Sequence, residues 1–184
     1  MSEKMRYSKG DGSRLAFRII SLVHDNRLLP LVKNPCVILK NAGLEAGRQV
    51  LEVGCGPGFY TLPAAEIVGP KGHVFAVDVN SWAIQRVRQK VQQAGVHNVT
   101  PMRTNGADSG LPDQSINIAI LFGLPRVAGG ETNLIKELGR VIKPGGRAVF
   151  QKSRRSEKAL AEAMQQAGFI FDGRQQRLLR FRRQ

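Results

Sequence analysis

One short segment of the chain combines residue types that could bind a ligand through the backbone. Residues 49–58 read QVLEVGCGPG, so an apolar strand carries a carboxylate, Glu52, near its end and passes into three glycines two residues apart. Because Gly54, Gly56 and Gly58 lack side chains, a ligand can approach the backbone closely there. The turn also exposes amide N–H groups at the start of the next helix, where they can donate to a ligand.

The spacing of these glycines differs from the dinucleotide fingerprint G-x-G-x-x-G, which would need its third glycine at position 59. That position is Phe59. Glu52 also argues against a pyrophosphate, because it would place a negative charge beside an anionic ligand. It favours a ligand with cationic or N–H donor groups, such as a methionine-type amino group.

Two further segments follow in an order that extends this pattern. Residues 73–78 read HVFAVD, so a second strand ends at Asp78, and residues 137–147 read ELGRVIKPGGR. Together with residues 49–58 they resemble class I S-adenosylmethionine-dependent methyltransferases. Residues 49–58 resemble motif I of that family, Asp78 resembles the acidic residue that ends the second strand, and residues 137–147 resemble the helix and turn before the fifth strand. The resemblance covers residues 35–151 and is closest in type to the methyltransferases of quinone biosynthesis. It implies S-adenosylmethionine as the cofactor.

The resemblance assigns roles to several polar residues. Asp78 lies 20 residues after Gly58 at a strand end, where a carboxylate can accept from both ribose hydroxyls. Val79 and Asn80 would then flank the adenine. In the family, the acidic residue of motif I helps to hold the methionine end, and this role falls to Glu52. A buried carboxylate there needs hydrogen-bonding partners, which nearby amides or a bound amino group would supply.

A loop at residues 105–112, NGADSGLP, resembles the family's loop whose acidic residue receives the adenine amino group. Asp108 stands one residue later than the family's usual acid, so either the loop is one residue shorter or Asp108 is only a turn residue. The full set of expected cofactor-binding residues is Glu52, Gly54, Cys55, Gly56, Gly58, Tyr60, Asp78, Val79, Asn80, Ala107, Asp108, Phe122 and Gly123.

The sequence does not identify catalytic residues. A sulfonium already activates its methyl group, so proximity and orientation can supply much of the rate. Three side chains are candidate general bases, and each has an ordinary alternative: His24 at a helix end, Tyr60 beside the cofactor at a helix start, and His97 in a turn. The histidines show no metal-ligand spacing with carboxylates or cysteines, so no metal is expected.

Two other methyltransferase chemistries are disfavoured by the sequence. Residues 121–126 read LFGLPR and lack the Asn/Asp-Pro-Pro-aromatic loop of amino-directed enzymes. Neither Cys36 nor Cys55 lies in a strand-end motif suited to covalent attack on a pyrimidine. Two such cysteines form no disulfide framework, which favours reduced thiols in a cytoplasmic protein.

Composition indicates one compact domain without a membrane span. The chain has 184 residues, of which 42% are hydrophobic, and no apolar run approaches the roughly 18 residues that a span needs. The N-terminus shows no signal-peptide pattern. We expect residues 1–34 to form an N-terminal helical or lid segment, and residues 35–184 to form a single cofactor-binding methyltransferase domain. Within the first segment, residues 14–33 are amphipathic, and core packing or an active-site cover is favoured over a membrane-surface helix.

From residue 35 onward, apolar patterns alternate between strands and helices. The expected strands cover residues 49–53, 73–78, 98–104, 115–122 and 146–151. The expected helices cover 81–94, with Ser81 as N-cap, 131–142, which stops at Pro144-Gly145-Gly146, and 156–167. Segments 169–173 and 178–181 predict a closing β-hairpin. Alternating units require a parallel sheet with helices on both faces.

The predicted fold is therefore α/β and doubly wound, with a mostly parallel seven-stranded sheet, helices on both faces and a closing β-hairpin at the C-terminus. The resemblance makes it the Rossmann-like methyltransferase fold. Ligands of such sheets bind beyond the carboxyl ends of the strands. The glycine turn, Asp78 and Gly123 are expected at that edge.

The charge of the chain leaves a second partner open. Its 28 basic and 14 acidic residues give a net charge of +14, and residues 152–184 hold nine basic but three acidic side chains. Such a surface attracts phosphates of RNA or anionic lipid. A solvated basic face is the slightly favoured alternative, with weak, non-specific polyanion binding. The arginines concerned are Arg174, Arg177, Arg180, Arg182 and Arg183.

The leading hypothesis is an S-adenosylmethionine-dependent methyltransferase acting on a small-molecule or lipid-like acceptor. One alternative is an RNA methyltransferase that uses the basic C-terminal surface. Another is a non-catalytic domain that binds the cofactor or a polyanion. The sequence leaves the acceptor and the oligomeric state open.

Overall fold

A computed structural model describes residues 34–122, 129–151 and 156–184 of the chain. The predicted helix at 14–33, with His24, and the predicted site residue Gly123 lie outside these ranges. The domain boundary at residue 34 stays a prediction. Among the described residues, no helix is long and apolar enough to cross a membrane.

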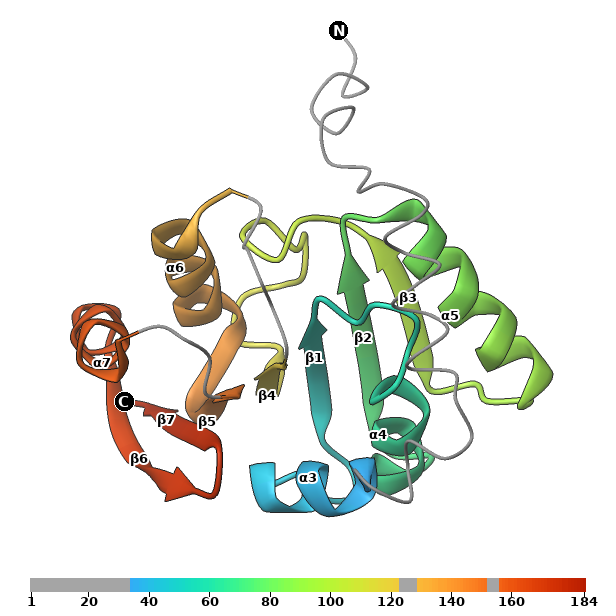
Figure 1. Ribbon diagram of the computed structural model, residues 1–184, viewed down its shortest axis with the longest axis horizontal. Coiled ribbons are helices and arrows are strands. Elements are labelled where there is room, and N and C mark those ends of the chain that lie inside the picture. Colours follow the sequence, from blue (N-terminus) through green and yellow to red (C-terminus); the bar gives the residue numbers. More distant parts are fainter. Residues whose placement is uncertain (1–33, 123–128, 152–155) are drawn as a thin grey trace, which may run out of the picture.

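One seven-stranded sheet organises the fold, in the order β3-β2-β1-β4-β5-β7-β6 (Figure 1). Strands β1 to β5 pair in parallel with one another, and β7 pairs antiparallel with both β5 and β6, which confirms the predicted sheet and closing hairpin. The strands are β1 (Gln49–Val53), β2 (His73–Asp78), β3 (Val99–Arg103), β4 (Ile116–Leu121), β5 (Ile142–Gln151), β6 (Phe169–Gln175) and β7 (Leu178–Arg183).

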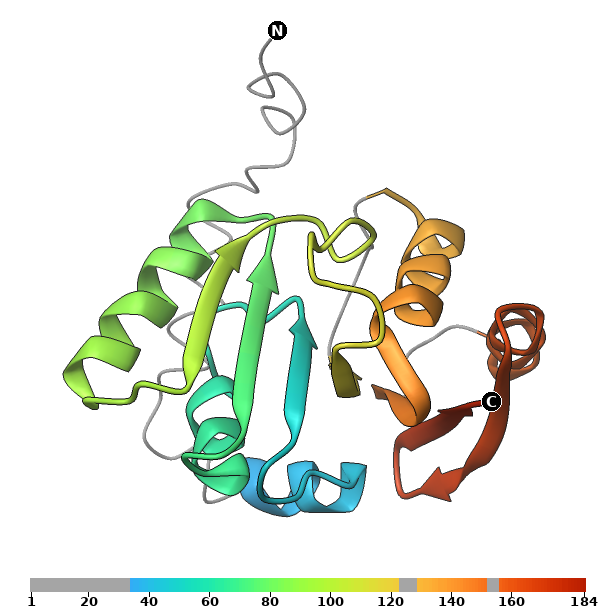
Figure 2. The same ribbon diagram turned by 180° about the vertical axis from the view of Figure 1, so that it is seen from behind.

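Helices cover both faces of the sheet, as predicted. On one face, Leu39 of α3 and Ile84 of α5 pack with strand residues such as Val50. On the other, Leu134 of α6 and Met164 of α7 pack with Leu51. The helices are α3 (Pro35–Ala42), α4 (Thr61–Val68), α5 (Ser81–Gln93), α6 (Glu131–Val141) and α7 (Glu157–Gln166). Figures 1 and 2 show α5 beside β3 and the α6–α7 pair at the opposite end of the sheet.

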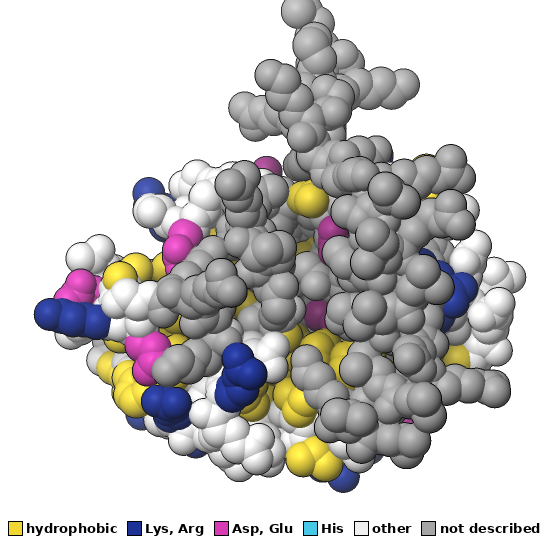
Figure 3. Space-filling model, in the orientation of Figure 1, with side chains coloured by type: hydrophobic (Ala, Val, Ile, Leu, Met, Phe, Trp, Pro, Cys, Tyr) yellow, Lys and Arg dark blue, Asp and Glu magenta, His cyan; other side chains and the backbone are white. Residues whose placement is uncertain are grey.

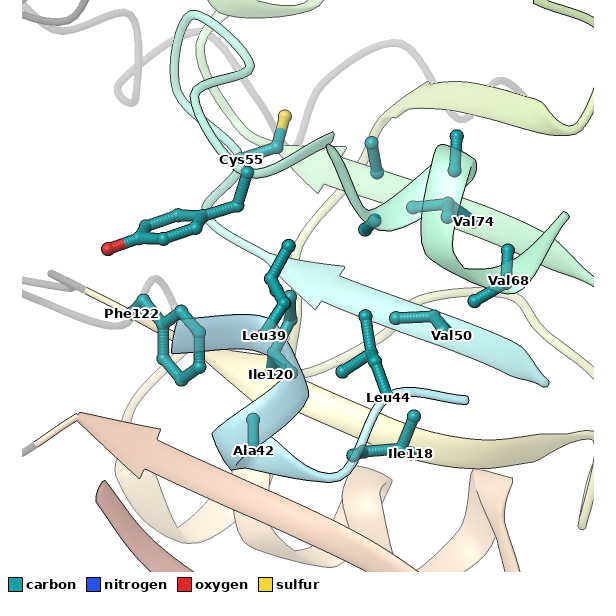
Figure 4. Close-up of a cluster of buried hydrophobic side chains, with 14 of the residues drawn as sticks. Leu39, Ala42, Leu44, Val50, Cys55, Val68, Val74, Ile118, Ile120 and Phe122 are labelled. Carbon is teal, nitrogen blue, oxygen red and sulfur yellow. The ribbon is translucent and has the colours of Figure 1, made fainter. Parts of the chain in front are cut away.

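The alternation of side chains along each strand explains this two-sided core. Successive residues of a strand face opposite sides of a sheet, so Val50 contributes to one cluster and Leu51 to the other. Both have no exposed surface. Figure 4 shows the first cluster, in which Leu39 of α3 lies near Ile120 of β4, and Leu44, just after α3, lies beside Val50 and Ile118.

Three sequence predictions need correction. Helix α3 was not predicted; Asn34 caps it by accepting from the N–H groups of Cys36 and Val37, and Gly43 ends it in a left-handed conformation. The N-cap of α5 is Asn80 rather than Ser81, because the Asn80 side chain accepts from the N–H groups at positions 82 and 83. Such caps stabilise a helix by satisfying its free N–H groups.

The third correction concerns the turn before the fifth strand. Helix α6 ends at Val141 and β5 begins at Ile142, so Pro144-Gly145-Gly146 lies inside the strand rather than before it. The pairing with β4 jumps from Ile116↔Ile142 to Ile118↔Arg147, which is a bulge that these residues form. A Cβ on Gly146 would lie 2.7 Å from Ile142 Cγ2, so only glycine fits there.

Candidate functional site

The glycine turn lies where β1 and β2 end, at the carboxyl edge of the sheet. The N–H groups of Gly54 and Cys55 both donate to the carbonyl of Val77, at 2.8 and 3.1 Å. These bonds attach the turn to the last residues of β2. The turn and Asp78 are thereby brought together, as the sequence predicted.

The three glycines all adopt positive φ, but they serve different purposes. Their φ values are 74°, 53° and 85° for Gly54, Gly56 and Gly58. A Cβ on Gly58 would lie 3.1 Å from Val87 Cγ2 of α5, whereas a Cβ on Gly56 would have nothing within 4 Å. Gly58 therefore permits close helix packing. Gly56 faces open space, where a ligand could approach its backbone.

Asp78 is held by two backbone N–H groups. Its Oδ2 accepts from Gly56 N and its Oδ1 from Asn80 N, each at 2.9 Å. Burial raises the pKa of Asp78, while the backbone hydrogen bonds act to lower it. Each carboxylate oxygen has two acceptor sites, so both can accept a further donor from a ligand beside the turn.

Asn80 and Val79 follow Asp78 at the same edge. The Asn80 side-chain oxygen accepts from Trp82 N at 2.9 Å and from Ala83 N at 3.4 Å. The Asn80 oxygen therefore caps α5. This structural role was not predicted from the sequence, which placed Asn80 only beside the adenine. The carbonyl of Val79 accepts from Arg103 Nε at 3.4 Å.

Glu52 is a buried carboxyl group inside this edge, with 4% of its surface exposed. The hydroxyl of Thr61, the first residue of α4, donates to Glu52 Oε2 at 2.6 Å. Burial raises the pKa of Glu52 to about 8; the Thr61 hydrogen bond lowers it and the charge of Asp78 raises it further. Glu52 is therefore mainly protonated at neutral pH, and a cationic ligand group would favour its ionised form. The partner Thr61 was not predicted from the sequence.

Aromatic rings pack beside the glycine turn. The ring of Tyr60 lies 4.8 Å from that of Phe59 and 5.1 Å from that of Phe122, both edge-on. All three are buried, as is Cys55. Figure 4 shows Phe122 at the end of the apolar cluster. Burial, together with nearby carboxylates, raises the pKa of the Cys55 thiol and disfavours a nucleophilic thiolate.

The loop at residues 104–110 lies directly on the end of β1. A Cβ on Gly106 would meet Val53 Cγ1 at 2.4 Å, so the loop approaches the strand without a side chain between them. The N–H of Asp108 donates to Asn105 O, and its carbonyl accepts from Thr104 Oγ1, each at 2.9 Å. The Asp108 side chain is exposed. The loop that holds Ala107 and Asp108 thus borders the glycine turn.

A buried polar network, missed by the sequence analysis, attaches this loop to α6. Ser109 donates to Glu137 Oε1 from its N–H at 3.0 Å and from its hydroxyl at 2.6 Å. Arg140 donates to Glu137, to Asp113 and to the carbonyl of Leu111. Burial acts to raise the pKa of Glu137, but hydrogen bonds from Arg140 and Ser109 lower it to about 2.

Two of the candidate general bases, Tyr60 and His97, lie within the described residues, and of these Tyr60 is at this edge. His97 precedes β3 and is exposed. Because β3 is parallel to β2, a residue before it lies at the amino edge of the sheet, opposite the glycine turn. His97 is therefore not part of the site.

Arginines of the last hairpin mostly have partners within the fold. Arg174 pairs with Glu157 at 3.7 Å, Arg182 lies 4.0 Å from Asp172, and Arg180 donates to Gln175. As predicted, Leu179 and Phe181 of β7 are buried while Arg182 is exposed. In Figure 3, Lys and Arg side chains lie at the lower left, where Figure 1 shows β6 and β7. Weak polyanion binding by this surface stays a prediction.

Comparisons with known proteins give consistent results. A protein-family profile described as "Methyltransferase domain" matches residues 44–176. The chain is 33% identical over 148 residues to demethylmenaquinone methyltransferase of Geobacillus stearothermophilus, which covers 77% of this chain and 63% of that protein. It is 35% identical over 112 residues to the protein of the same name from Geobacillus sp. (strain WCH70), covering 60% of this chain and 47% of the relative. The chain therefore spans roughly half to two thirds of these relatives.

Among solved structures, a SAM-dependent methyltransferase from Aquifex aeolicus is similar, with a TM-score of 0.72 and 23% identity. The match covers 91% of this chain and 96% of that one. At this identity the likeness shows the fold. It agrees with the seven-stranded, doubly wound sheet described above.

Proposed function

This chain belongs to the methyltransferase-domain family, whose cofactor is S-adenosylmethionine, and we propose that it transfers a methyl group from this cofactor to a quinone-like acceptor. The acceptor rests on the names of the relatives, which are demethylmenaquinone methyltransferases. Because the chain spans only part of their length, their substrate is a proposal for this protein.

The observation that carries the proposal is the hydrogen bond from Gly56 N to Asp78 Oδ2 beside open space above Gly56. A ligand that enters this space meets backbone without a side chain, together with a carboxylate that retains acceptor capacity. Hydroxyl pairs of a ribose suit Asp78 because they donate to carboxylate oxygens. The residues therefore fit the cofactor on their own chemistry.

We assign the remaining cofactor contacts by position at the same edge. Glu52, buried and mainly protonated in the free protein, would accept the cationic methionine end and ionise on binding. Val79, Asn80 and the loop of Ala107 would border the adenine. Tyr60 would close the apolar side. Cys55 and Phe122 would line the site without reacting.

The sulfonium of the bound cofactor supplies an activated methyl group. The task of the chain is therefore to hold the cofactor and exclude water, and the sequence offers no obligatory catalytic base. The buried rings of Phe59, Tyr60 and Phe122 form an apolar wall beside the glycine turn. Such a wall suits an aromatic, poorly hydrated acceptor.

Calorimetry with S-adenosylhomocysteine, the demethylated product, tests the cofactor site. Asp78→Ala should weaken binding by about 1.5–3 kcal/mol, as expected for charged hydrogen bonds. Asp108→Ala is the matched comparison, because its carboxylate is exposed on the neighbouring loop. A large loss in Asp108→Ala would assign the adenine contact to Asp108, and a small one would leave it a turn residue. Equal affinity in wild type and Asp78→Ala, or preferential NAD binding, would contradict the assignment.

A radiolabelled methyl-transfer assay tests the acceptor. Cell extract is fractionated into RNA, protein, lipid and small molecules, and label is expected in the lipid fraction with quinones. Purified demethylmenaquinone should then accept the label. Label in the RNA fraction would contradict the quinone-like acceptor and support the alternative of an RNA methyltransferase. Cofactor binding with no label in any fraction would favour a non-catalytic domain.

A further inference from the structure

A second hollow lies at the amino edge of the sheet, opposite the glycine turn. It lies where β4 and β5 begin, next to the end of α3, and has a volume of about 200 Å³. Its lining residues are Gly43, Arg48, Asn117, Ile118, Lys143, Pro144, Gly145, Gly146 and Arg147. Three of them are cationic and none is acidic. We propose that this hollow, the amino-edge pocket, binds the phosphate group of a small soluble molecule.

Within the part of the chain that the structure describes, the cationic side chains retain donors that no acceptor uses. Arg48 gives Nε and Nη2 to Glu45, at 3.3 and 2.7 Å, which leaves Nη1. Arg147 gives Nε to Asp172 at 2.8 Å, which leaves both terminal nitrogens. Lys143 is half-buried, and its ammonium has no hydrogen-bond acceptor within the described ranges. Three positive groups, one before β1 and two on β5, therefore converge on one small volume.

The two carboxylates that pair with these arginines orient them rather than fill the pocket. Neither Glu45 nor Asp172 is among the lining residues. Glu45 accepts from Nε and Nη2 of Arg48, and Asp172 accepts from Nε of Arg147. The remaining N–H groups of the two guanidinium groups therefore keep a fixed direction. Guanidinium groups arranged in this way match the oxygens of phosphate. Counted with these two carboxylates, the three cations leave an excess positive charge.

Asn117 adds a neutral donor of fixed orientation. Its Oδ1 accepts from the backbone N–H of Gln49 at 2.8 Å. The amide group is therefore oriented with oxygen toward β1, and its NH₂ remains to donate elsewhere. An aspartate at this position could make the same bond to Gln49 but would add a negative charge to the pocket. The residue present is the one that keeps the lining free of anions.

The backbone of the pocket is also accessible. Gly145 has φ +76° and a Cβ there would have nothing within 4 Å, so the chain borders open space. Ligands can approach such a residue closely. The bulge of β5 that Gly145 and Gly146 form is thus also the wall of the pocket. Its size suits one tetrahedral anion and its immediate substituent rather than a strand of nucleic acid, which is bound along an extended groove.

The test is a titration at constant ionic strength, read by calorimetry and by NMR shifts of backbone amides. Inorganic phosphate and glycerol phosphate are the probes, and chloride is the control salt. We expect saturable binding of both phosphates, with the amide shifts at Lys143 and at Gly145, Gly146 and Arg147. Lys143→Gln should weaken it about tenfold or more, as for the loss of a charged hydrogen bond. Asn117→Asp should abolish it, since the variant keeps the bond to Gln49, removes the amide donor and adds a negative charge to the lining.

Lys158→Gln is the matched control, because Lys158 is a lysine of α7 with 87% of its side chain exposed and is not among the lining residues of the pocket. It should bind phosphate like wild type. Circular dichroism confirms that each variant is folded. The proposal fails if phosphate binding is not saturable, or if Lys158→Gln weakens it as much as Lys143→Gln. It also fails if only RNA or phosphatidic acid vesicles bind and the free phosphates do not.

Discussion

Two buried glutamates in this fold have opposite electrostatic environments. Glu52 and Glu137 are 4% and 8% exposed, and each lies beside the candidate cofactor edge. Glu52 accepts one hydrogen bond, from Thr61, and its pKa is raised to about 8 by burial. Glu137 accepts from Ser109 and Arg140, which lower its pKa to about 2 against the effect of burial.

The contrast separates a residue that completes the fold from one that is suited to a ligand. Glu137 already has a cation and is charged in the free protein, so its role is to hold the loop of Ser109 against α6. Glu52 has no cation among the described residues that contact it, and its burial is unfavourable to charge. A bound ammonium group would supply what Arg140 supplies to Glu137.

The largest expected effect comes from removing the satisfied carboxylate. Glu137→Ala leaves the Ser109 hydroxyl without its acceptor and removes one of the acceptors of the partly buried Arg140 guanidinium, and should cost about 2–4 kcal/mol of unfolding free energy. Urea denaturation measures this loss. Glu162→Ala, at an exposed position on α7, should change stability little. If Glu137→Ala lost less unfolding free energy than Glu162→Ala, the network of Glu137 would not be what holds the loop.

The second effect is a difference in pH dependence. The pKa of Glu52 is raised on folding from 4.5 to about 8, so the folded state holds a proton that the unfolded state releases. Stability from this group therefore falls as pH rises between about 4.5 and 8. Glu52→Gln should remove this fall, so the variant should gain stability relative to wild type as pH rises from 4.5 to about 8. A constant difference across that range would contradict the raised pKa.

Glu137 predicts the opposite slope. Its pKa is lowered from 4.5 to about 2, so its stabilisation is present above pH 4.5 and is lost as pH falls toward 2. The stability difference between wild type and Glu137→Ala should shrink over that acid range. Thermal unfolding of both proteins from pH 2 to 5 measures it. A difference that stays constant would show that Glu137 is not held ionised by its partners.

Two glycine substitutions in the turn after Glu52 are expected to have smaller effects, and they distinguish helix packing from cofactor binding. Gly56→Ala and Gly58→Ala both place a side chain at positive φ, which costs about 1–2 kcal/mol. Only Gly58→Ala also meets Val87 of α5. We therefore expect Gly58→Ala to be the less stable variant. Gly56→Ala should lose more cofactor affinity than stability, in calorimetry and denaturation compared side by side. Unchanged cofactor affinity in Gly56→Ala would make the turn purely structural.

The smallest effects come from the two hydroxyl donors. Ser109→Ala removes one of several hydrogen bonds to Glu137, and Thr61→Val removes the one from Thr61 to Glu52. Each should cost about 0.5–1.5 kcal/mol. Thr61→Val should also raise the pKa of Glu52 further, because its hydrogen bond lowers that pKa. Carboxyl titration followed by NMR distinguishes the two variants. An unshifted Glu52 pKa in Thr61→Val would show that the hydroxyl does not stabilise the charge.

Local patterns were sufficient to predict most of the sheet. Strands β1 and β2 have the predicted bounds. The apolar run of β1 is followed directly by Gly54, and that of β2 ends at the acidic residue Asp78, so the end of each strand is marked in the sequence. Helix α3 was missed because it has only eight residues and begins at Pro35. Pro144-Gly145-Gly146 was expected to end the preceding helix, but these residues form a bulge in β5. The bulge depends on contacts with Ile142 and with β4.

The site was less predictable than the fold. Asp78 and the glycine turn could be placed together because parallel strands end at one edge. The contacts of Glu137 with Ser109 join residues 28 positions apart, and no spacing rule connects them. Gly106 could have been suspected as a close approach, since a glycine follows Asn105 in the loop. The roles of individual residues toward the cofactor stay predictions until binding is measured.

The outer strands of the sheet bear on how copies of this chain behave in concentrated solution. Pro101 lies within β3, which forms one edge, and a proline has no N–H to donate to an added strand. At the other edge, β6 carries a bulge between Phe171 and Gly173, and Phe171 is 55% exposed. An exposed aromatic on a regular edge strand would invite stacking of chains into aggregates. The missing donor on one side and the bulge on the other make the sheet a poor template for such growth.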